Sequence, residues 1–447
     1  MAIETPTHSG VDPAARRAAG SQPHAPRAGG RALIALFAVA LALRMFAVFA
    51  LDTPGDARGE SAWKWGGESA CLAQSLADGR GYGDPWCRDT GPSSWLTPPY
   101  PALVAVLMRT FGGVNPRTAA ALFVLQALAS AATCLVIVRL GERLAWPRAG
   151  LLAGWLWAIY PVAIWNAAAV VWDTTFAALG VSLVLLLLLR APETLRATAL
   201  AGLAYGALLF VNPAPLVLAP AALGFLALAS RGAAAAARAC AVFTAAALAV
   251  CLPWIVRNQL VLGTAQLRPN FTVELRMGNN DTANGRPVPF RYHPSHVDEE
   301  LELYRRLGEA DYARDNTRRA LSWIAENPGR FLALTLRRAQ IFWVGELPSS
   351  DPRRADHLAP GRDPRSWLKF AAFFAAGAGA LVALFLADLR GPQRWLVTSA
   401  VLLYGLPYFV THVSERYRFP IDPLVVLLDA WLALWLLRRL RPREANA

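Results

Sequence analysis

The sequence of 447 residues predicts an all-α polytopic membrane protein with about ten transmembrane helices. Hydrophobic residues make up 55% of the chain and charged residues only 17%, whereas a soluble domain carries about 25% charged residues. The apolar residues fall into blocks of roughly 17–22 residues, the length that crosses about 30 Å of hydrocarbon as a helix. This pattern excludes a soluble enzyme, a disordered chain and an outer-membrane barrel, whose alternating segments run only about 10 residues.

The chain divides at the changes between polar and apolar composition. Residues 1–31 are rich in Ala, Gly, Pro and Arg and are expected to be a disordered tail without a cleavable signal pattern. We expect an N-terminal membrane module over 32–255, an extracytoplasmic segment over 256–366, C-terminal membrane helices over 367–437 and a tail over 438–447. The expected spans are 32–51, 117–140, 149–167, 170–189, 197–212, 214–229, 236–255, 367–387, 395–410 and 420–437.

Arginines predict the orientation. The chain has a net charge of +13 and only two lysines, Lys64 and Lys369, which suggests a GC-rich and therefore bacterial coding sequence. Arginines cluster in the tails and in alternate short loops, which the positive-inside rule places in the cytoplasm. The basic charge is thus explained by topology, so no nucleic-acid partner is expected. Both termini are expected in the cytoplasm and both long polar segments outside the inner membrane of a bacterium.

The first outer loop, 52–116, contains two expected short helices. Tyr100–Phe111 is apolar but too short to span, so it is expected to lie on the outer surface. Glu60–Leu76 is expected to be a second helix, ended by a glycine-rich turn at 79–83. Cys71 and Cys87 lie in this loop and can form a disulfide if the loop is outside the cytoplasm. In the later outer segment, 298–319 and 319–343 are predicted helices, the second interrupted at Asn327.

Three polar clusters are expected to share the outer face. The first loop carries several acids, Asp173 begins the fourth span, and His412, Glu415, Arg416 and Arg418 precede the last span. Ionisable groups at the membrane edge are functional candidates by default. An acid can take a proton from a hydroxyl, and arginines can hold a phosphate as it leaves. Phosphate-loop, HExxH and paired CxxC motifs are absent from the sequence.

Several stretches resemble a known family. Residues 65–82 and 95–103 of the first loop, together with 252–258, 274–280 and 415–420, resemble the protein mannosyltransferase-like family of GT-C membrane glycosyltransferases. The similarity is to a bacterial branch related to the lipid A aminoarabinose transferase. The resemblance implies a GT-C-like architecture, a polyprenyl-phosphate-linked sugar donor, an acceptor on the outer face and a first-loop acid as the base.

The resemblance also implies roles for single residues. Family members carry an acidic pair about fifteen residues before the glycine at 79, but this chain has Lys64 there. Glu68, one helical turn later, is the preferred base, with Glu60 and Asp56 as alternates. Asp173 would orient the acceptor or support the base. The donor phosphate would be held by Arg416, Arg418 and Tyr417; candidate substrate-binding residues are His412, Glu415 and Arg44.

The predicted function is transfer of a hexose or pentose from a polyprenyl phosphate to an acceptor hydroxyl, with inversion at the anomeric carbon. The acceptor is a lipid, a glycan or a protein. His293, His296 and Asp298 form a loose metal-ligand pattern, but a solvated loop is expected there, with no metal and no certain cofactor. The alternatives are a non-catalytic envelope-glycan assembly protein and a flippase or transporter of lipid-linked saccharides. A transporter would carry charges inside its spans, where only Arg44 was expected.

Overall fold

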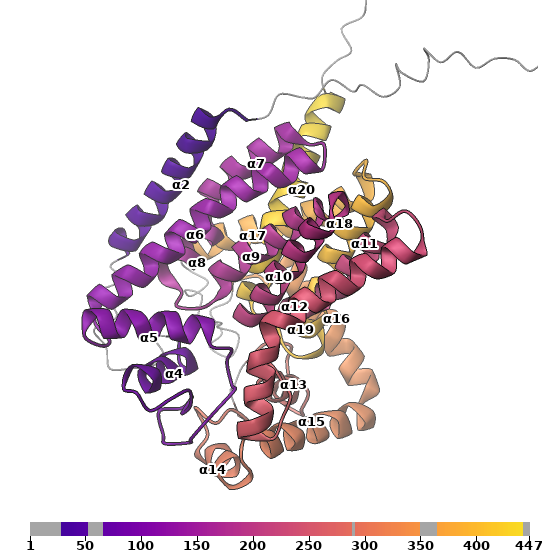
Figure 1. Cartoon of the computed structure of the whole chain (residues 1–447). Helices are drawn as coiled ribbons and strands as arrows, with labels where there is room; N and C mark the ends of the chain where they lie inside the picture. Colours follow the sequence, from indigo (N-terminus) through magenta and orange to yellow (C-terminus); the bar gives the residue numbers. More distant parts are fainter. Residues whose placement is uncertain (1–27, 52–65, 288–290, 349–363, 441–447) are drawn as a thin grey trace, which may run out of the picture.

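The computed structural model describes residues 28–51, 66–287, 291–348 and 364–440. Within these ranges the chain is helical and contains no strand, only one isolated bridge between Gly83 and Pro92 (Figure 1). The all-α prediction is therefore confirmed. The expected tail covered 1–31; its residues 1–27 and the alternate acids Asp56 and Glu60 lie outside the described residues, while Gly30 and Arg31 already belong to the first helix.

Every expected span is helical. Among the described residues six segments are long and apolar enough to cross a membrane, or seven if one bent pair counts as a span, so the chain is a multi-pass membrane protein. Five of the six are α2 (Gly30–Ala50), α6 (Pro116–Arg143), α12 (Ala233–Leu262), α17 (Pro364–Leu386) and α20 (Asp422–Leu440); the sixth contains α9 (Thr174–Leu188). The bent pair is α7 (Pro147–Ile159) with α8 (Pro161–Ala169). The other three expected spans coincide with shorter helices, α10 (Leu195–Val211), η3 (Ala214–Leu218) with α11 (Ala219–Ala229), and α18 (Gly391–Tyr404) with α19 (Leu406–Val410).

The bend of 49° between α7 and α8 has a cause in the sequence. Pro161 has no N–H, so it cannot bond to the carbonyl of Trp157 one turn earlier. The fully buried Arg44 of α2 donates instead to the carbonyl oxygens of Trp157 and Ala158, each at 2.9 Å. Arg44 also bonds to the hydroxyl of Ser130 at 2.7 Å. The buried Arg44 thus supplies donors at the break, to the carbonyl of Ala158 and, beside the Tyr160 N–H, to that of Trp157.

The short helices gather at one end of the bundle. Figure 1 shows α4 (Glu68–Ala77), α13 (Phe271–Gly278), α14 (Asp298–Leu307) and α15 (Glu309–Glu326) at the end opposite the first turn of α2 and the last turn of α20. The apolar segment of the first loop forms α5 (Pro99–Phe111), as expected. The helix expected from residue 60 begins, in the described residues, at Glu68. The two long outer helices are instead three, because α16 (Pro328–Val344) follows a break at Asn327 and α14 ends at Gly308.

Two other boundaries differ from the expectation. Helix α12 continues nine residues past Pro253, because a proline inside a helix removes only one backbone hydrogen bond; Gly263, with φ of 69°, ends the helix instead. The last span also carries charges that were not expected within spans. Asp429 lies in α20, and its Oδ1 packs where a Cβ on Gly379 of α17 would stand, 2.3 Å away. The glycine makes room for this carboxylate inside the bundle.

Candidate active site

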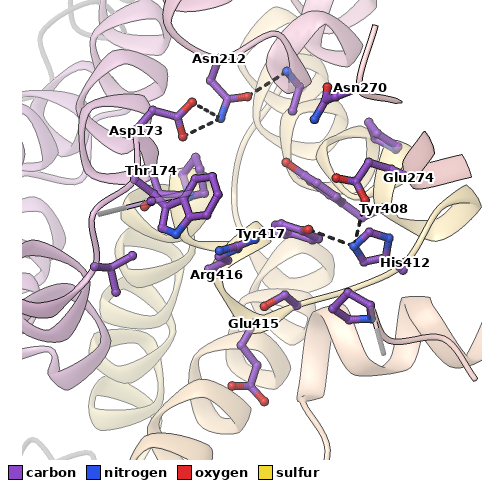
Figure 2. Close-up of a pocket in the computed structure, with 18 of the residues that line it drawn as sticks. Asp173, Thr174, Asn212, Asn270, Glu274, Tyr408, His412, Glu415, Arg416 and Tyr417 are labelled. Atoms are coloured by element: carbon purple, nitrogen blue, oxygen red, sulfur yellow. Dashed lines mark hydrogen bonds and ion pairs between the residues drawn. The ribbon is translucent and has the colours of Figure 1, made fainter. Parts of the chain in front are cut away.

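A cavity of about 1470 Å³ lies where the short helices gathered at one end of the bundle meet the long helices. Segments that are distant in the sequence form its walls: the start of α4, the α8–α9 connection, the loop after α12, helix α13 and the segment before α20. Figure 2 shows Asp173, Glu274, Arg416 and Tyr417 around this space. Glu68 lines the same cavity, so the structure brings together Glu68, Asp173 and Arg416, three of the residues that the sequence singled out.

Glu68 is the first residue of α4 and is only 8% exposed. Its Oε1 lies 3.3 Å from Nε2 of the buried His293, while its buried Oε2 has no hydrogen-bond partner among the described residues. Burial raises the pKa of Glu68, but the hydrogen bond and charge of His293, together with the charge of Arg268, outweigh burial and lower it. One oxygen is therefore anchored, and the other can accept a hydrogen bond from a ligand.

Asp173 immediately precedes α9 and is oriented by the neighbouring span. The side-chain amide of Asn212 donates to both carboxylate oxygens at 3.3 Å, and Oδ1 of Asn212 accepts from the backbone N–H of Ala214 at 3.0 Å. Burial raises the pKa of Asp173, and Arg268 and Asn212 offset part of that rise. The Asn212–Pro213 break that ends α10 thus positions the carboxylate at the cavity wall.

The opposite wall joins aromatic rings to charged groups. The guanidinium of Arg416 stacks on the ring of Trp172, with 4.4 Å to the ring centroid. Tyr417 stacks on Tyr408 at 4.5 Å between centroids. Nε2 of the buried His412 lies 3.1 Å from the Tyr417 hydroxyl and 3.4 Å from Oε2 of Glu274, an acid that the sequence analysis did not single out.

Arg418 is not part of the cavity, which corrects its expected role in phosphate binding. It is fully buried inside the bundle, where its Nε lies 2.7 Å from Oδ1 of Asp422. Its other nitrogens donate to the carbonyls of Trp343 and Phe373 at 2.6 and 3.0 Å. Two short helical turns, Glu415–Tyr417 and Phe419–Ile421, flank Arg418. As a result, the side chain of Arg416 lines the cavity, whereas that of Arg418 is buried between the helices of the bundle.

Two further candidates have structural partners. Arg44 does not line the cavity, because its guanidinium completes the α7–α8 bend, which corrects its expected role in substrate binding. Glu415 does line the cavity, and its Oε1 lies 3.6 Å from Arg286, which also bonds to Glu346 at 2.6 Å. Glu415 therefore shares one cation with a second carboxylate.

Sequence reasoning missed two cations of the site. Arg268 lies in the loop after α12, lines the cavity, and has a buried Nε without a hydrogen-bond partner among the described residues. The ammonium of Lys369 lies 3.4 Å from the ring centroid of Trp165 and also lines the cavity. Lys369 had a signal in the sequence, because it is one of only two lysines in the chain, whereas Arg268 lies in a loop without a local signal.

The described residues contain no group of three or more His, Cys, Asp or Glu side chains that could hold a metal ion. His293 and His296 do not form such a group with Asp298. Instead, His293 contacts Glu68, and both histidines bond to Ser295.

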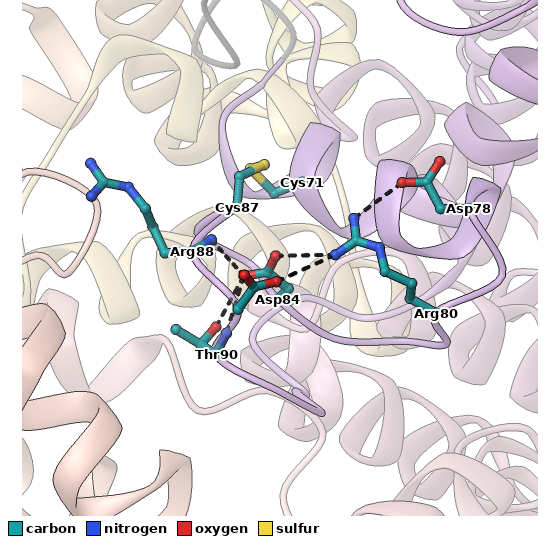
Figure 3. The surroundings of a disulfide bond; sticks show 8 residues. Cys71, Asp78, Arg80, Asp84, Cys87, Arg88 and Thr90 are labelled. Atoms are coloured by element: carbon teal, nitrogen blue, oxygen red, sulfur yellow. Dashed lines mark hydrogen bonds and ion pairs between the residues drawn. A yellow bond between two sulfur atoms is a disulfide. The ribbon is translucent and has the colours of Figure 1, made fainter.

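Cys71 and Cys87 form a disulfide that fixes the first loop (Figure 3). Cys71 follows Glu68 by one turn of α4, so the bridge ties the helix carrying Glu68 to the loop. Asp84 holds the same loop, because its Oδ1 accepts from the backbone N–H groups of Arg88 at 2.8 Å and Thr90 at 3.3 Å. The sequence left this disulfide open as a possibility, and the structure contains it.

The fold has solved relatives, although no protein-family model and no curated protein matches the sequence. The oligosaccharyltransferase AglB of the archaeon Archaeoglobus fulgidus, in complex with an inhibitory peptide and a dolichol-phosphate, matches with a TM-score of 0.52 and 14% identity over 91% of this chain and 50% of that one. The same organism's enzyme with zinc and sulfate matches with a TM-score of 0.53 and 14% identity over 92% and 49%. A third structure, tethered to an acceptor peptide containing the NVT sequon, matches with a TM-score of 0.52 and 13% identity over 91% and 50%.

These likenesses establish the fold. The chain shares the polytopic all-helical fold of the archaeal oligosaccharyltransferase structures over about nine-tenths of its own length, and it spans about half the length of the solved chains that it matches. At this identity the activity of those proteins does not follow from the fold alone.

Proposed function

We propose that the protein is a membrane glycosyltransferase that moves a sugar from a polyprenyl-phosphate-linked donor to an acceptor hydroxyl on the extracytoplasmic side. The observation that carries the proposal is the shared cavity. Two carboxylates, Glu68 and Asp173, line it together with the cations Arg268, Lys369 and Arg416. Apolar side chains of the spans complete its walls, which suits a ligand with a phosphate head and a hydrocarbon tail.

Glu68 is the base in this proposal. An acceptor O–H donates to the open Oε2 of Glu68 and loses its proton as its oxygen attacks the anomeric carbon. The bond from that carbon to the donor phosphate breaks at the same time, and its electron pair leaves on the phosphate oxygen. A single displacement inverts the anomeric carbon.

The cations stabilise the phosphate as its negative charge grows. Arg416 and Lys369 are each held against a tryptophan ring, so their charges are oriented before the donor arrives. The Nε of Arg268, which has no hydrogen-bond partner within the described part of the chain, supplies a donor on the side of the two carboxylates, since the charge of Arg268 influences the pKa of both. Preorganised donors of this kind lower the barrier without further rearrangement.

Asp173 is the positioning carboxylate. Both of its oxygens already accept from Asn212, so it is less suited than Glu68 to take a proton. Its remaining lone pairs can accept from a second hydroxyl of the sugar or of the acceptor. This division of roles follows from the different partners of the two acids.

The Cys71–Cys87 bridge supports the proposed orientation, because disulfides persist outside the cytoplasm. The first turn of α2 and the last turn of α20 share the opposite end of the bundle, which fits two cytoplasmic termini in an inner membrane. The resemblance to the bacterial mannosyltransferase-like branch supports a polyprenyl-phosphate sugar donor. The archaeal relative was captured with a dolichol-phosphate and with an acceptor peptide, which fits a lipid-linked donor and admits a protein acceptor.

The transporter alternative gains three charged groups inside the bundle, Arg418, Asp422 and Asp429, but none of them lines the cavity. Transport would need charged groups along a path between both faces. The polar groups of the cavity gather instead at the end of the bundle that carries the outer helices.

The test is a transfer assay with the full chain in lipid nanodiscs, using labelled polyprenyl-phosphate sugars and an extract of envelope acceptors. We expect Glu68→Gln to lower the turnover by about 10²- to 10⁴-fold, the usual contribution of a general base. Glu299→Gln, an exposed acid of α14, is the matched control and should keep full activity. Full transfer by Glu68→Gln would remove this assignment, and full transfer by Asp173→Asn as well would remove the mechanism.

A further inference from the structure

The α8–α9 segment, residues 165–174, carries two buried polar atoms without a hydrogen-bond partner among the described residues. One is Oδ1 of Asn166 on α8, a residue that is 4% exposed. The other is the hydroxyl of Thr174, which is 7% exposed and begins α9. Both residues line the cavity, and Figure 2 shows Thr174 next to Asp173 at its wall. Buried polar groups are almost always paired, so these two atoms require an explanation.

The position of Thr174 at the start of a helix explains why its hydroxyl is left over. A threonine inside a helix usually donates to the carbonyl four residues earlier, as Thr133 does to Ala129 at 2.9 Å. Thr174 is the first residue of α9, so Val170, four residues earlier, lies outside that helix. The carbonyl of Val170 accepts instead from the side-chain amide of Gln126, at 2.9 Å. The hydroxyl of Thr174 therefore has no backbone acceptor within its own helix.

The side-chain amide of Asn166 is oriented by its own helix. Its Nδ2 donates to the carbonyl of Val162, one turn earlier, at 2.9 Å. This bond uses the nitrogen side of the amide, so Oδ1 remains an acceptor without a donor. The two leftover atoms therefore have complementary abilities. Oδ1 of Asn166 can accept from a ligand hydroxyl, and the hydroxyl of Thr174 can both accept from one and donate to it.

The same segment also supports two of the cations that are proposed to hold the donor phosphate. Trp165, one residue before the asparagine, carries the ammonium of Lys369 at 3.4 Å from its ring centroid. Trp172, two residues before the threonine, carries the guanidinium of Arg416 at 4.4 Å. In a glycosyl phosphate the sugar ring is bonded directly to the phosphate, so its hydroxyl groups lie beside whatever binds that phosphate. The two leftover atoms are therefore placed for the sugar of the donor.

We propose that Asn166 and Thr174 form a subsite that binds the hydroxyl groups of the donor sugar. The inference rests on the proposed function, and the ligand of the subsite is a polyhydroxylated sugar bonded to the carrier phosphate. One sugar hydroxyl donates to Oδ1 of Asn166, and a second exchanges a hydrogen bond with the hydroxyl of Thr174. The subsite forms no covalent bond. It fixes the rotation of the ring about its bond to the phosphate and disfavours sugars that leave these polar atoms unpaired.

The subsite is tested by binding to the full chain in lipid nanodiscs, without any acceptor. The probes are labelled polyprenyl phosphate and a panel of its hexose and pentose derivatives. We expect Thr174→Val and Asn166→Leu each to weaken binding of the preferred derivative by about 3- to 10-fold, the contribution of one neutral hydrogen bond. Binding of sugar-free polyprenyl phosphate should stay the same. Thr174→Ser keeps the hydroxyl and should bind like the parent protein.

The matched control is Thr133→Val on α6, because Thr133 is also fully buried but does not line the cavity. It should bind every probe like the parent protein. Unchanged affinity for the sugar derivatives in both subsite variants would overturn the proposal. An equal loss for the sugar-free carrier would also overturn it, because the residues would then act on the phosphate or on the fold. A loss seen only after an acceptor extract is added would contradict the assignment to the donor sugar.

The binding assay separates this inference from the proposed function, because it requires no transfer. If the parent protein transfers no sugar but the subsite variants still lose affinity for the sugar derivatives, the proposed function fails and the subsite stands. If transfer proceeds and the variants bind the derivatives like the parent protein, the subsite fails and the proposed function stands.

The unfolding midpoint without ligand supplies a second readout that a merely structural role would change. Thr174→Val removes a buried hydroxyl without a partner among the described residues, so this substitution should not lower the midpoint. Thr133→Val removes a hydroxyl that bonds to the carbonyl of Ala129, so it should unfold at a lower temperature than the parent protein. If Thr174→Val lost as much stability as Thr133→Val, its hydroxyl would already be bonded within the protein, which would contradict the subsite.

Discussion

Arg418 and Asp422 form a fully buried ion pair inside the bundle, with 2.7 Å between Nε and Oδ1. Removing one partner leaves an uncompensated charge at a fully buried position. We therefore predict that Arg418→Ala destabilises the protein by about 3–5 kcal/mol. Unfolding in detergent, followed by tryptophan fluorescence, measures the loss. If Arg418→Ala instead kept the stability of the parent protein and weakened donor binding, the result would support the original assignment of Arg418 to the phosphate site.

Substitution of Arg416 or Arg268 should weaken donor binding without destabilising the protein, in contrast to the substitution of Arg418. Arg416→Ala and Arg268→Ala remove cavity cations that are proposed to contact the donor phosphate, and a hydrogen bond to a charged group contributes about 1.5–3 kcal/mol. We expect each variant to weaken the binding of polyprenyl phosphate by about 10- to 100-fold, with little change in the unfolding midpoint. Arg318→Ala, on the exposed face of α15, is the control. Equal affinity in all three variants would argue against these phosphate contacts.

Gly66 connects the two proposed catalytic segments by close contact. It has a φ of 83°, and a Cβ there would lie 2.4 Å from the carbonyl oxygen of Val171, two residues before Asp173. We predict that Gly66→Ala shifts Glu68 relative to Asp173 and lowers the turnover by about tenfold or more, because small displacements of reacting groups are costly.

The control for this substitution is Gly79→Ala in the same loop. Gly79 also has a positive φ, of 77°, but no atom lies within 4 Å of its added Cβ. Gly79→Ala therefore introduces the same backbone strain as Gly66→Ala but no close contact with another segment, so this variant should lose stability and keep its turnover per folded molecule. If both variants lose turnover equally, strain alone is responsible.

The Cys71–Cys87 disulfide should stabilise the first loop. Its sequence separation of 16 corresponds to about 3 kcal/mol in the chain-entropy model. We expect Cys71→Ser with Cys87→Ser, or reduction by dithiothreitol, to lower the thermal midpoint and also the turnover, because Cys71 follows Glu68 on α4. Cys240→Ser, which removes a free cysteine of α12, is the control. Unchanged turnover after verified reduction would separate the bridge from the site.

The pH dependence of transfer should report on Glu68. Its pKa lies below the ordinary value of 4.5, so the charged form persists, and the stabilising contact with His293 is lost only as the pH falls through the lowered pKa. We predict that the acid limb of kcat/KM lies below pH 4.5. In His293→Gln the charge of the imidazole is gone, so the pKa of Glu68 rises and the limb moves to higher pH. A limb that does not move would show that Glu68 is not the group that titrates.

The sequence allowed the helices to be predicted because hydrophobic blocks determine them directly. Their exact ends were harder, as Pro253 shows. A proline signals a possible end, but the packing of the first loop against the extension of α12 and the glycine at 263 decide where the helix stops. The charges inside α20 were missed because one aspartate among many apolar residues does not alter the hydropathy of the block.

The site was predictable where the chain direction alone brings residues to one face. Asp173 and Arg416 each lie shortly before a helical span, and Glu68 lies in the first loop between two spans. Arg418 shows the limit, since residues two positions apart in a short irregular turn can face a cavity or a helix core. His293 and Arg268 lie in long loops, and only tertiary packing, which no local pattern encodes, places them beside the first loop.

Helix α12 is continuous past Pro253, so one helix connects the membrane-spanning part of the chain to the first loop. Beyond Pro253, the guanidinium of Arg257 donates to the carbonyls of Ser93 and Tyr82 at 2.8 and 3.1 Å. Membrane helices tilt to match the thickness of the surrounding lipid. Because α12 is embedded in lipid at one end and hydrogen-bonded to the first loop at the other, a change in its tilt would move the first loop. We therefore expect the catalytic geometry to vary with the acyl-chain length of the lipid.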